Sequence, residues 1–100
     1  MFHKAFFANT SQEKIKQQMQ KEGFSPLVVK DKPGFVYKPH KHAETKYLVC
    51  LEGAMQVTFN SKTYDFEPGD KLIIKGNTTH EALVGDKGCV FLWSEKIVKQ

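Results

Sequence analysis

Beyond residue 23, short apolar runs alternate with residues that favour turns. In residues 55–60, MQVTFN, apolar and polar side chains alternate, which predicts a strand with one buried and one solvent-facing side. In residues 46–52, KYLVCLE, apolar residues fall on both sides, as expected for a strand between two layers. Turn signals such as Pro-Gly, Asn-Ser and Gly-Asn recur about every 8–12 residues, a spacing typical of an all-β sandwich or barrel.

Residues 11–22 have a helical pattern instead. Thr10 and Glu13 have the spacing of a capping box in which Thr10 is the N-cap, and Gly23 is of the type that commonly ends a helix. The apolar positions of this segment form one narrow stripe, Ile15 and Met19. We therefore expect a helix over about residues 11–22 that lies on the surface and is no core element.

The length and composition fit one ordinary globular domain. The chain has 100 residues, of which 40% are hydrophobic and 26% charged. It contains no repeat, no low-complexity tract and no linker. We therefore expect a single domain over residues 1–100, with the barrel at about residues 24–98.

The basic surplus does not point to nucleic acid. The net charge is +4, but the lysines are spread along the chain and there is no arginine, the residue best suited to read base edges. A nucleic-acid-binding surface would gather its charge on one face. A solvated, lysine-rich surface is the simpler interpretation.

Neither a membrane nor an oxidising compartment is indicated. No apolar run approaches the length of about 20 residues that a membrane span needs. The first ten residues lack the apolar centre of a signal peptide, so we expect a cytoplasmic protein. Cys50 and Cys89 fall inside apolar runs and form no CxxC pair, which favours buried, reduced thiols.

The histidines provide the candidate chemistry. His40 and His42 are two positions apart, which on a strand puts both imidazoles on one face. His80 follows a turn later in the chain, and antiparallel pairing can bring it opposite the first two. Three converging imidazoles could chelate a divalent ion. His3, near the start of the chain, is interpreted as a surface residue.

Two segments resemble the two motifs of the cupin superfamily. Residues 34–53 follow the first motif, which runs from a glycine through HxH and an acidic position to a second glycine. Residues 69–80 resemble the second motif, which runs from a glycine to a third histidine. The positions in register are Gly34, His40, His42, Gly53, Gly69 and His80. The resemblance implies an all-β double-stranded β-helix, a jelly-roll-like barrel, commonly a homodimer, that holds iron, manganese, nickel or zinc.

The chain departs from the motif at its acidic ligand, because Lys46 occupies that position. An ammonium cannot ligate a cation, so Lys46 either swings away, stays neutral, or marks a site that no longer binds metal. Glu44 shares the parity of His40 and His42 and could bind the metal or pair with Lys46, unless residues 43–45 form a turn. The chain is similar here to a group of small cupins that also carry lysine, and that likeness implies no settled activity.

Lys46 has two further interpretations. It could form a salt bridge with Glu44 or Glu81 at the barrel mouth, or it could grip an anionic ligand or act as a base. We assign Lys46 and Tyr47 as candidate ligand-binding residues. Trp93, Phe91 and Phe59, like Tyr47, are expected mainly to fill the barrel or a dimer interface.

The sequence thus predicts a metal-binding cupin that takes a small polar or anionic ligand, with no catalytic residue assigned. A metal-dependent dioxygenase or isomerase acting on a small oxygenated substrate is an alternative. A structural homodimer with a vestigial site is another, because one fold supports many functions.

Overall fold

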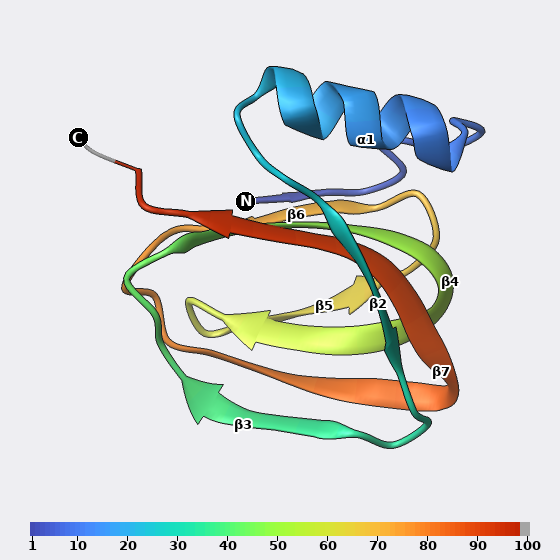
Figure 1. The fold of residues 1–100 in the computed structure, drawn as a ribbon. Helices are drawn as coiled ribbons and strands as arrows, with labels where there is room; N and C mark the ends of the chain where they lie inside the picture. The colour runs from blue at the N-terminus through green and yellow to red at the C-terminus, as the bar shows by residue number, and fades with distance from the viewer. Residues whose placement is uncertain (99–100) are drawn as a thin grey trace.

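The computed structural model describes residues 1–98 and is dominated by antiparallel strands, with one helix in the described part (Figure 1). The elements are β1 (Phe2–His3), α1 (Gln12–Lys21), β2 (Leu27–Asp31), β3 (Val36–His40), β4 (Thr45–Phe59), β5 (Lys62–Phe66), β6 (Lys71–Ile74) and β7 (His80–Lys96). The predicted all-β class is confirmed, and the arrangement is that of a double-stranded β-helix. No described helix is long and apolar enough to cross a membrane.

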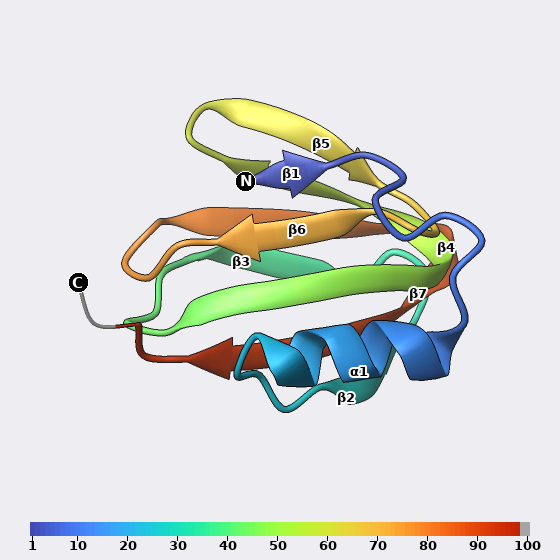
Figure 2. The same ribbon diagram turned by 90° about the horizontal axis from the view of Figure 1, so that it is seen from above.

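Two long strands organise the molecule. β4 and β7 pair with each other along most of their length, and both turn back so that their two halves lie in different layers (Figures 1 and 2). β6 and β5 pair with opposite halves of β4, while β2 and β3 pair with opposite halves of β7. All these pairings are antiparallel.

The bend of β4 depends on irregular pairing. The register against β7 shifts between Cys50 and Glu52 and again between Gly53 and Met55. Such bulges bend a strand and increase its twist. At Gly53 the backbone φ is +71°, and a Cβ would lie 2.1 Å from the carbonyl oxygen of Gly88. Only glycine fits this close approach.

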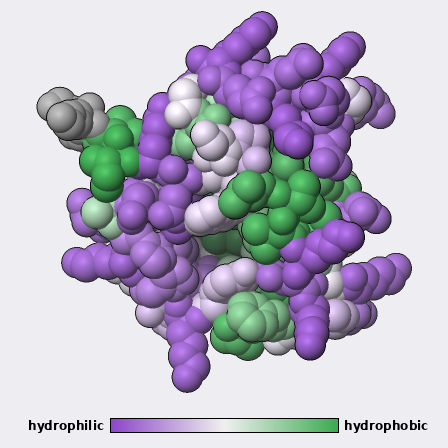
Figure 3. Space-filling view, in the orientation of Figure 1, coloured by the Kyte–Doolittle hydropathy of each residue, from purple (hydrophilic) through white to green (hydrophobic). Residues whose placement is uncertain are grey.

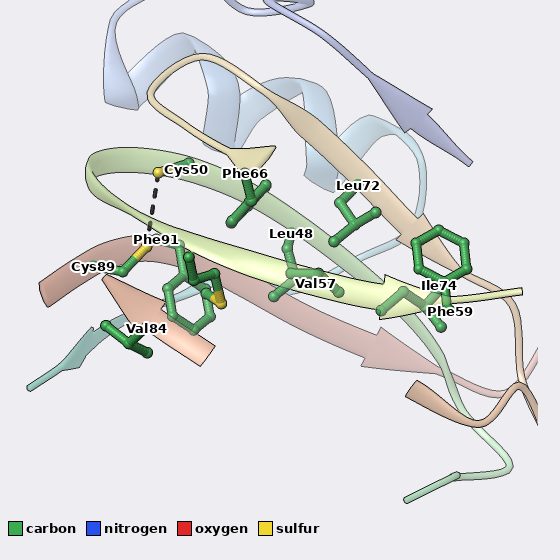
Figure 4. Close-up of a cluster of buried hydrophobic side chains, with 11 residues drawn as sticks. Leu48, Cys50, Val57, Phe59, Phe66, Leu72, Ile74, Val84, Cys89 and Phe91 are labelled. Atoms are coloured by element: carbon green, nitrogen blue, oxygen red, sulfur yellow. Dashed lines mark hydrogen bonds between the residues drawn. The ribbon is translucent and has the colours of Figure 1, made fainter. Parts of the chain in front are cut away.

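The main core lies inside the barrel, between the two layers (Figure 4). It takes side chains of one parity from the long strands, including Leu48, Val57 and Phe91. Leu72 from β6 and Phe66 from β5 complete it, and both are fully buried. The alternation predicted for residues 55–60 is therefore the alternation between barrel interior and exterior.

A second core lies between α1 and the outer face of the upper layer (Figure 1). Ile15 and Met19 are 2% and 0% exposed and pack with Val49 and Leu92. The expectation that the helix contributes nothing to the core is wrong. A narrow stripe suffices because the sheet beneath it is also apolar on this face.

The helix ends are defined by local hydrogen bonds. The N-cap is Ser11 and not Thr10, because the Ser11 hydroxyl accepts the Lys14 N–H at 3.2 Å. The predicted stop at Gly23 is confirmed, because its φ is +88°. The N–H groups of Gly23 and Phe24 donate to the carbonyl oxygens of Gln20 and Met19 in the last turn, each at 3.0 Å. This pattern is a Schellman motif.

The two cysteines are neighbours in space. Cys50 and Cys89 are 1% and 2% exposed, and their Sγ atoms lie 3.8 Å apart, joined by a hydrogen bond and not by a disulfide (Figure 4). Their burial is confirmed. The hydrogen bond between the two sulfurs and the surrounding apolar core raise the pKa of the Cys50 thiol.

Candidate metal centre

Three histidines meet at one end of the barrel. Antiparallel pairing puts His40, the last residue of β3, opposite His80, the first residue of β7. Their ring centroids lie 4.3 Å apart, and the ring of His42 lies 4.8 Å from His40 and 5.9 Å from His80. One ring nitrogen from each residue lies within 4.8 Å of the others.

Backbone carbonyls set the protonation pattern of two of these rings. His40 Nδ1 lies 2.5 Å from the Lys38 carbonyl oxygen, and His80 Nδ1 lies 2.9 Å from that of Thr78. A carbonyl oxygen only accepts, so each Nδ1 donates its proton, and in the neutral ring each Nε2 then keeps a lone pair. This arrangement is common for metal-binding imidazoles, because the outer hydrogen bond fixes both tautomer and ring orientation.

His42 is held by a loop and not by β3, which ends at His40. The N–H of Asn77 donates to the His42 carbonyl oxygen at 2.6 Å, and the N–H of Gly76 donates to Thr45 Oγ1 at 3.0 Å. A Cβ on Gly76 would lie 2.3 Å from the Ala43 carbonyl oxygen. The loop between β6 and β7 thus packs directly against the loop that carries His42.

The histidines line a cavity of about 370 Å³ in the barrel interior. Most of the lining is apolar: Val29, Leu48, Met55, Val57, Phe66, Leu72, Ile74, Ala82 and Phe91. The remaining lining residues are Tyr37, His40, His42, Lys46, His80 and Trp93. The Tyr37 hydroxyl is already engaged, since it donates to Asp31 Oδ2 at 2.6 Å.

Lys46 enters the same cavity from the beginning of β4. Its side chain is 10% exposed and forms an ion pair with Glu95, which faces it across the β4–β7 pairing. The Lys46 Nζ also lies 5.0 Å from the centroid of the Trp93 ring. A salt bridge was one of the predicted roles, but its partner is neither Glu44 nor Glu81.

Comparison with known proteins agrees with this geometry. Residues 27–95 match the family described as the cupin domain. This chain is a member of the cupin family. The match spans the strands that form the barrel, from β2 to β7, and both histidine-bearing segments.

Individual relatives are more distant. The chain is 30% identical over 61 residues to DddW of Ruegeria pomeroyi, a protein named dimethylsulfoniopropionate lyase. That stretch is 61% of this chain but only 40% of DddW, so the chain spans well under half of that relative. KdgF from Halomonas sp. is 25% identical with a TM-score of 0.62, covering 73% of this chain and 69% of KdgF. The cupin domain of Cnp3 from Schizosaccharomyces pombe is 16% identical, with a TM-score of 0.68 over 75% of this chain and 56% of its own.

The three imidazoles of this cupin fit a small divalent ion. Zinc–nitrogen bonds of about 2.0–2.1 Å put two tetrahedral ligands about 3.4 Å apart. The ligating atoms here lie within 4.8 Å of one another, so a modest inward movement closes the set. His42 is exposed and lies on a loop, which leaves its ring free to make that movement. Cupins commonly hold divalent metals with such a histidine set.

Two predicted site residues lie elsewhere. The Tyr47 side chain is fully buried in the core beneath α1, where its hydroxyl donates to Glu22 Oε2 at 2.8 Å. Its assignment as a ligand contact is wrong, because its parity is opposite to that of Lys46 and Leu48. Glu44 is not part of the histidine cluster, since residues 43 and 44 form a bend before β4 begins. The alternative in which a turn breaks the parity of Glu44 is the one observed.

The environment of His80 favours the neutral form of its imidazole. Burial lowers its pKa, and the nearby His40, His42 and Lys46 side chains lower it further. The hydrogen bond to the Thr78 carbonyl oxygen acts in the opposite direction, and its effect is smaller than that of burial. A neutral imidazole is the form that can ligate a cation.

Sequence reasoning missed Glu95 and most of the apolar cavity wall, of which only Phe91 and Trp93 were expected to fill the barrel or a dimer interface. Glu95 became visible only through the register that puts it opposite Lys46. The wall could have been anticipated, because Leu48, Val57 and Phe91 all have the inward parity of their strands.

Proposed function

We propose that this cupin binds one divalent transition metal ion through His40, His42 and His80. We propose further that the ion receives the polar head of a small anionic ligand within the barrel. The observation that carries the proposal is the convergence of three imidazole nitrogens within 4.8 Å at the mouth of a 370 Å³ cavity. Iron, manganese, nickel and zinc are the candidate ions, since imidazole suits several of them.

A bound ion in this position would supply Lewis-acid chemistry by polarising an oxygen atom of the ligand. The protein's own contributions are to orient and to exclude water. The carbonyl oxygens of Lys38 and Thr78 keep two imidazoles in the ligating tautomer. The apolar wall limits water behind the ligand, and the Lys46–Glu95 pair adds a neutral polar boundary.

Elemental analysis of untagged protein tests the metal site. We expect about one equivalent of metal in the natural protein and a loss of at least tenfold in His40→Ala, because two imidazoles make a weak site. His3→Ala is the matched control, since it removes a histidine outside the cluster. Metal at full occupancy in His40→Ala, or an equal loss in His3→Ala, would refute the proposal.

The charge on Lys46 gives the same experiment a second arm. The ammonium repels a dication, so Lys46→Ala should retain or increase metal content. Loss of metal in Lys46→Ala would mean that the lysine supports the site in a way that the proposal does not include. A sample with no metal in any variant would favour a structural homodimer with a vestigial site.

Enzymatic activity is a second candidate, favoured by the similarity to DddW. It would be a lyase reaction on a small carboxylate, in place of the dioxygenase or isomerase reaction expected from the resemblance alone. Metal-loaded protein incubated with dimethylsulfoniopropionate, and followed by NMR, should consume it in a manner that His80→Gln abolishes. Consumption that continues in His80→Gln would contradict a role for the histidine cluster.

A homodimer is a further proposal. The chain exposes apolar side chains on β2, where Leu27 and Val28 are 61% and 44% exposed, and Figure 3 shows hydrophobic atoms gathered over this strand. Covering such a surface would stabilise a pair of chains. Light scattering should give twice the chain mass, and Leu27→Lys should shift it toward the monomer. A monomer in the natural protein would refute this proposal.

Location in the cytoplasm stays a prediction from sequence.

A further inference from the structure

The chemistry of the cavity is divided between its two ends. Four ionisable lining residues sit together at one end: His40 ends β3, His42 follows it, His80 begins β7 and Lys46 is the second residue of β4. Tyr37, the other ionisable lining residue, lies three residues earlier on β3, where its hydroxyl donates to Asp31 Oδ2. Figure 1 shows these three strand ends on the same side of the barrel. Deeper in, toward the bend of the long strands, the walls are Met55, Phe66 and their apolar neighbours. A ligand that fills the cavity therefore needs a polar head and an apolar body.

The charge of the head follows from the ligand set. No carboxylate belongs to the histidine cluster in the described residues, so a bound dication would keep its full charge. The ammonium of Lys46 is already paired with Glu95, so the two add no net charge to the cavity. A charge in a partly desolvated site needs a counter-charge. An anionic head is the group that would provide it.

The size of the body follows from the volume. A protein cavity of about 150 Å³ holds benzene, so a cavity of this size has room for roughly ten to fifteen non-hydrogen atoms. The measured volume is about 370 Å³. Burying each additional methylene in such a cavity should tighten binding about fourfold. Tyr37 also lines the cavity, but its hydroxyl already donates to Asp31 Oδ2. A polar group on the body would therefore lose its water without gaining a free donor from this residue, which should weaken binding about fivefold or more.

We propose that the ligand of this site is a monocarboxylate with an apolar body, an acyl or aryl acid with the carboxylate at the histidines. This inference rests on the proposed metal function, because the bound ion supplies the charge that selects an anion. It adds the shape and polarity of the rest of the molecule.

The test measures dissociation constants of linear carboxylates by calorimetry on zinc-loaded protein. Acetate, butanoate, hexanoate and octanoate should bind about fourfold more tightly per methylene until the cavity is full. 6-Hydroxyhexanoate should bind at least fivefold more weakly than hexanoate, and hexan-1-ol at least tenfold more weakly. Equal affinity across the acids, or hydroxyhexanoate matching hexanoate, would overturn the inference.

A cavity-filling variant checks that the acid enters the barrel. Ala82 lines the cavity, so Ala82→Leu should remove space and weaken octanoate binding at least tenfold while leaving acetate within twofold. Ala8→Leu makes the same change at an exposed position outside the cavity lining and should leave both affinities unchanged. Octanoate binding that is unaffected by Ala82→Leu would also overturn the inference.

Different results would refute the metal site and the preference for apolar carboxylates. If elemental analysis finds that the protein takes up none of iron, manganese, nickel and zinc, the proposed function fails, and the inference fails with it. If zinc binds to the histidines but the carboxylates show no dependence on chain length, only the inference fails.

Discussion

The ion pair between Lys46 and Glu95 makes a quantitative prediction about stability. The two side chains are 10% and 26% exposed. When its partner is removed, the Lys46 ammonium is therefore only weakly hydrated. Breaking a fully buried ion pair from one side costs about 3–5 kcal/mol. Because Glu95 is partly open to solvent, we expect Glu95→Gln to cost about 1–3 kcal/mol. Lys46→Met removes the charge but keeps an apolar stem beside Trp93, so it should cost less than about 1 kcal/mol.

Urea denaturation of metal-free protein measures these costs. Thermal melts give a second readout. For a domain of this size, a loss of 1 kcal/mol lowers the melting temperature by about 4–8 °C, so Glu95→Gln should melt about 4–24 °C lower. The double variant should be close to Lys46→Met alone, because the carboxamide no longer faces a charge. Lys62→Met, on the exposed part of β5, is the control for loss of a lysine. Additivity of the two single changes within about 0.5 kcal/mol would refute this account of the pair.

Three further predictions concern pH, packing and thiol access. Because the folded pKa of His80 lies below its unfolded value of 6.5, the unfolded chain binds the proton first as the pH falls. The stability of metal-free protein should therefore be fully present above pH 6.5 and decline below it until the folded pKa is reached. Circular dichroism melts should show this decline reduced in His80→Gln. Gly76→Ala should lower metal affinity about tenfold by calorimetry, because its Cβ would push against Ala43 in the His42 loop. Cys50 and Cys89 should resist a thiol reagent in native protein and both react in urea, since they are at most 2% exposed; rapid native labelling would contradict that burial.

Much of the fold follows from local rules. Strand parity predicted which sides of residues 55–60 face the core, and glycine conformation predicted the helix end at Gly23. The motif spacing correctly grouped the three histidines, because both segments fix positions at strand ends. Tyr47 was an avoidable error, because its parity is opposite to that of Lys46.

Other features depend on register between distant strands. The ion pair between Lys46 and Glu95 joins residues 49 positions apart. The register of β4 against β7 sets this pair, and that register shifts at two bulges in β4. No local pattern contains that information. The burial of α1 was missed for a similar reason: Ile15 and Met19 are too few to form a core alone, and their apolar partner surface comes from β4 and β7.

X-ray absorption spectroscopy of the zinc-loaded protein tests the central claim most directly, because it counts the imidazoles bound to the ion. The account predicts three histidine ligands at about 2.0–2.1 Å, with light oxygen donors completing the shell and no sulfur. Two or fewer histidines, or a sulfur scatterer from Cys50 or Cys89, would contradict it.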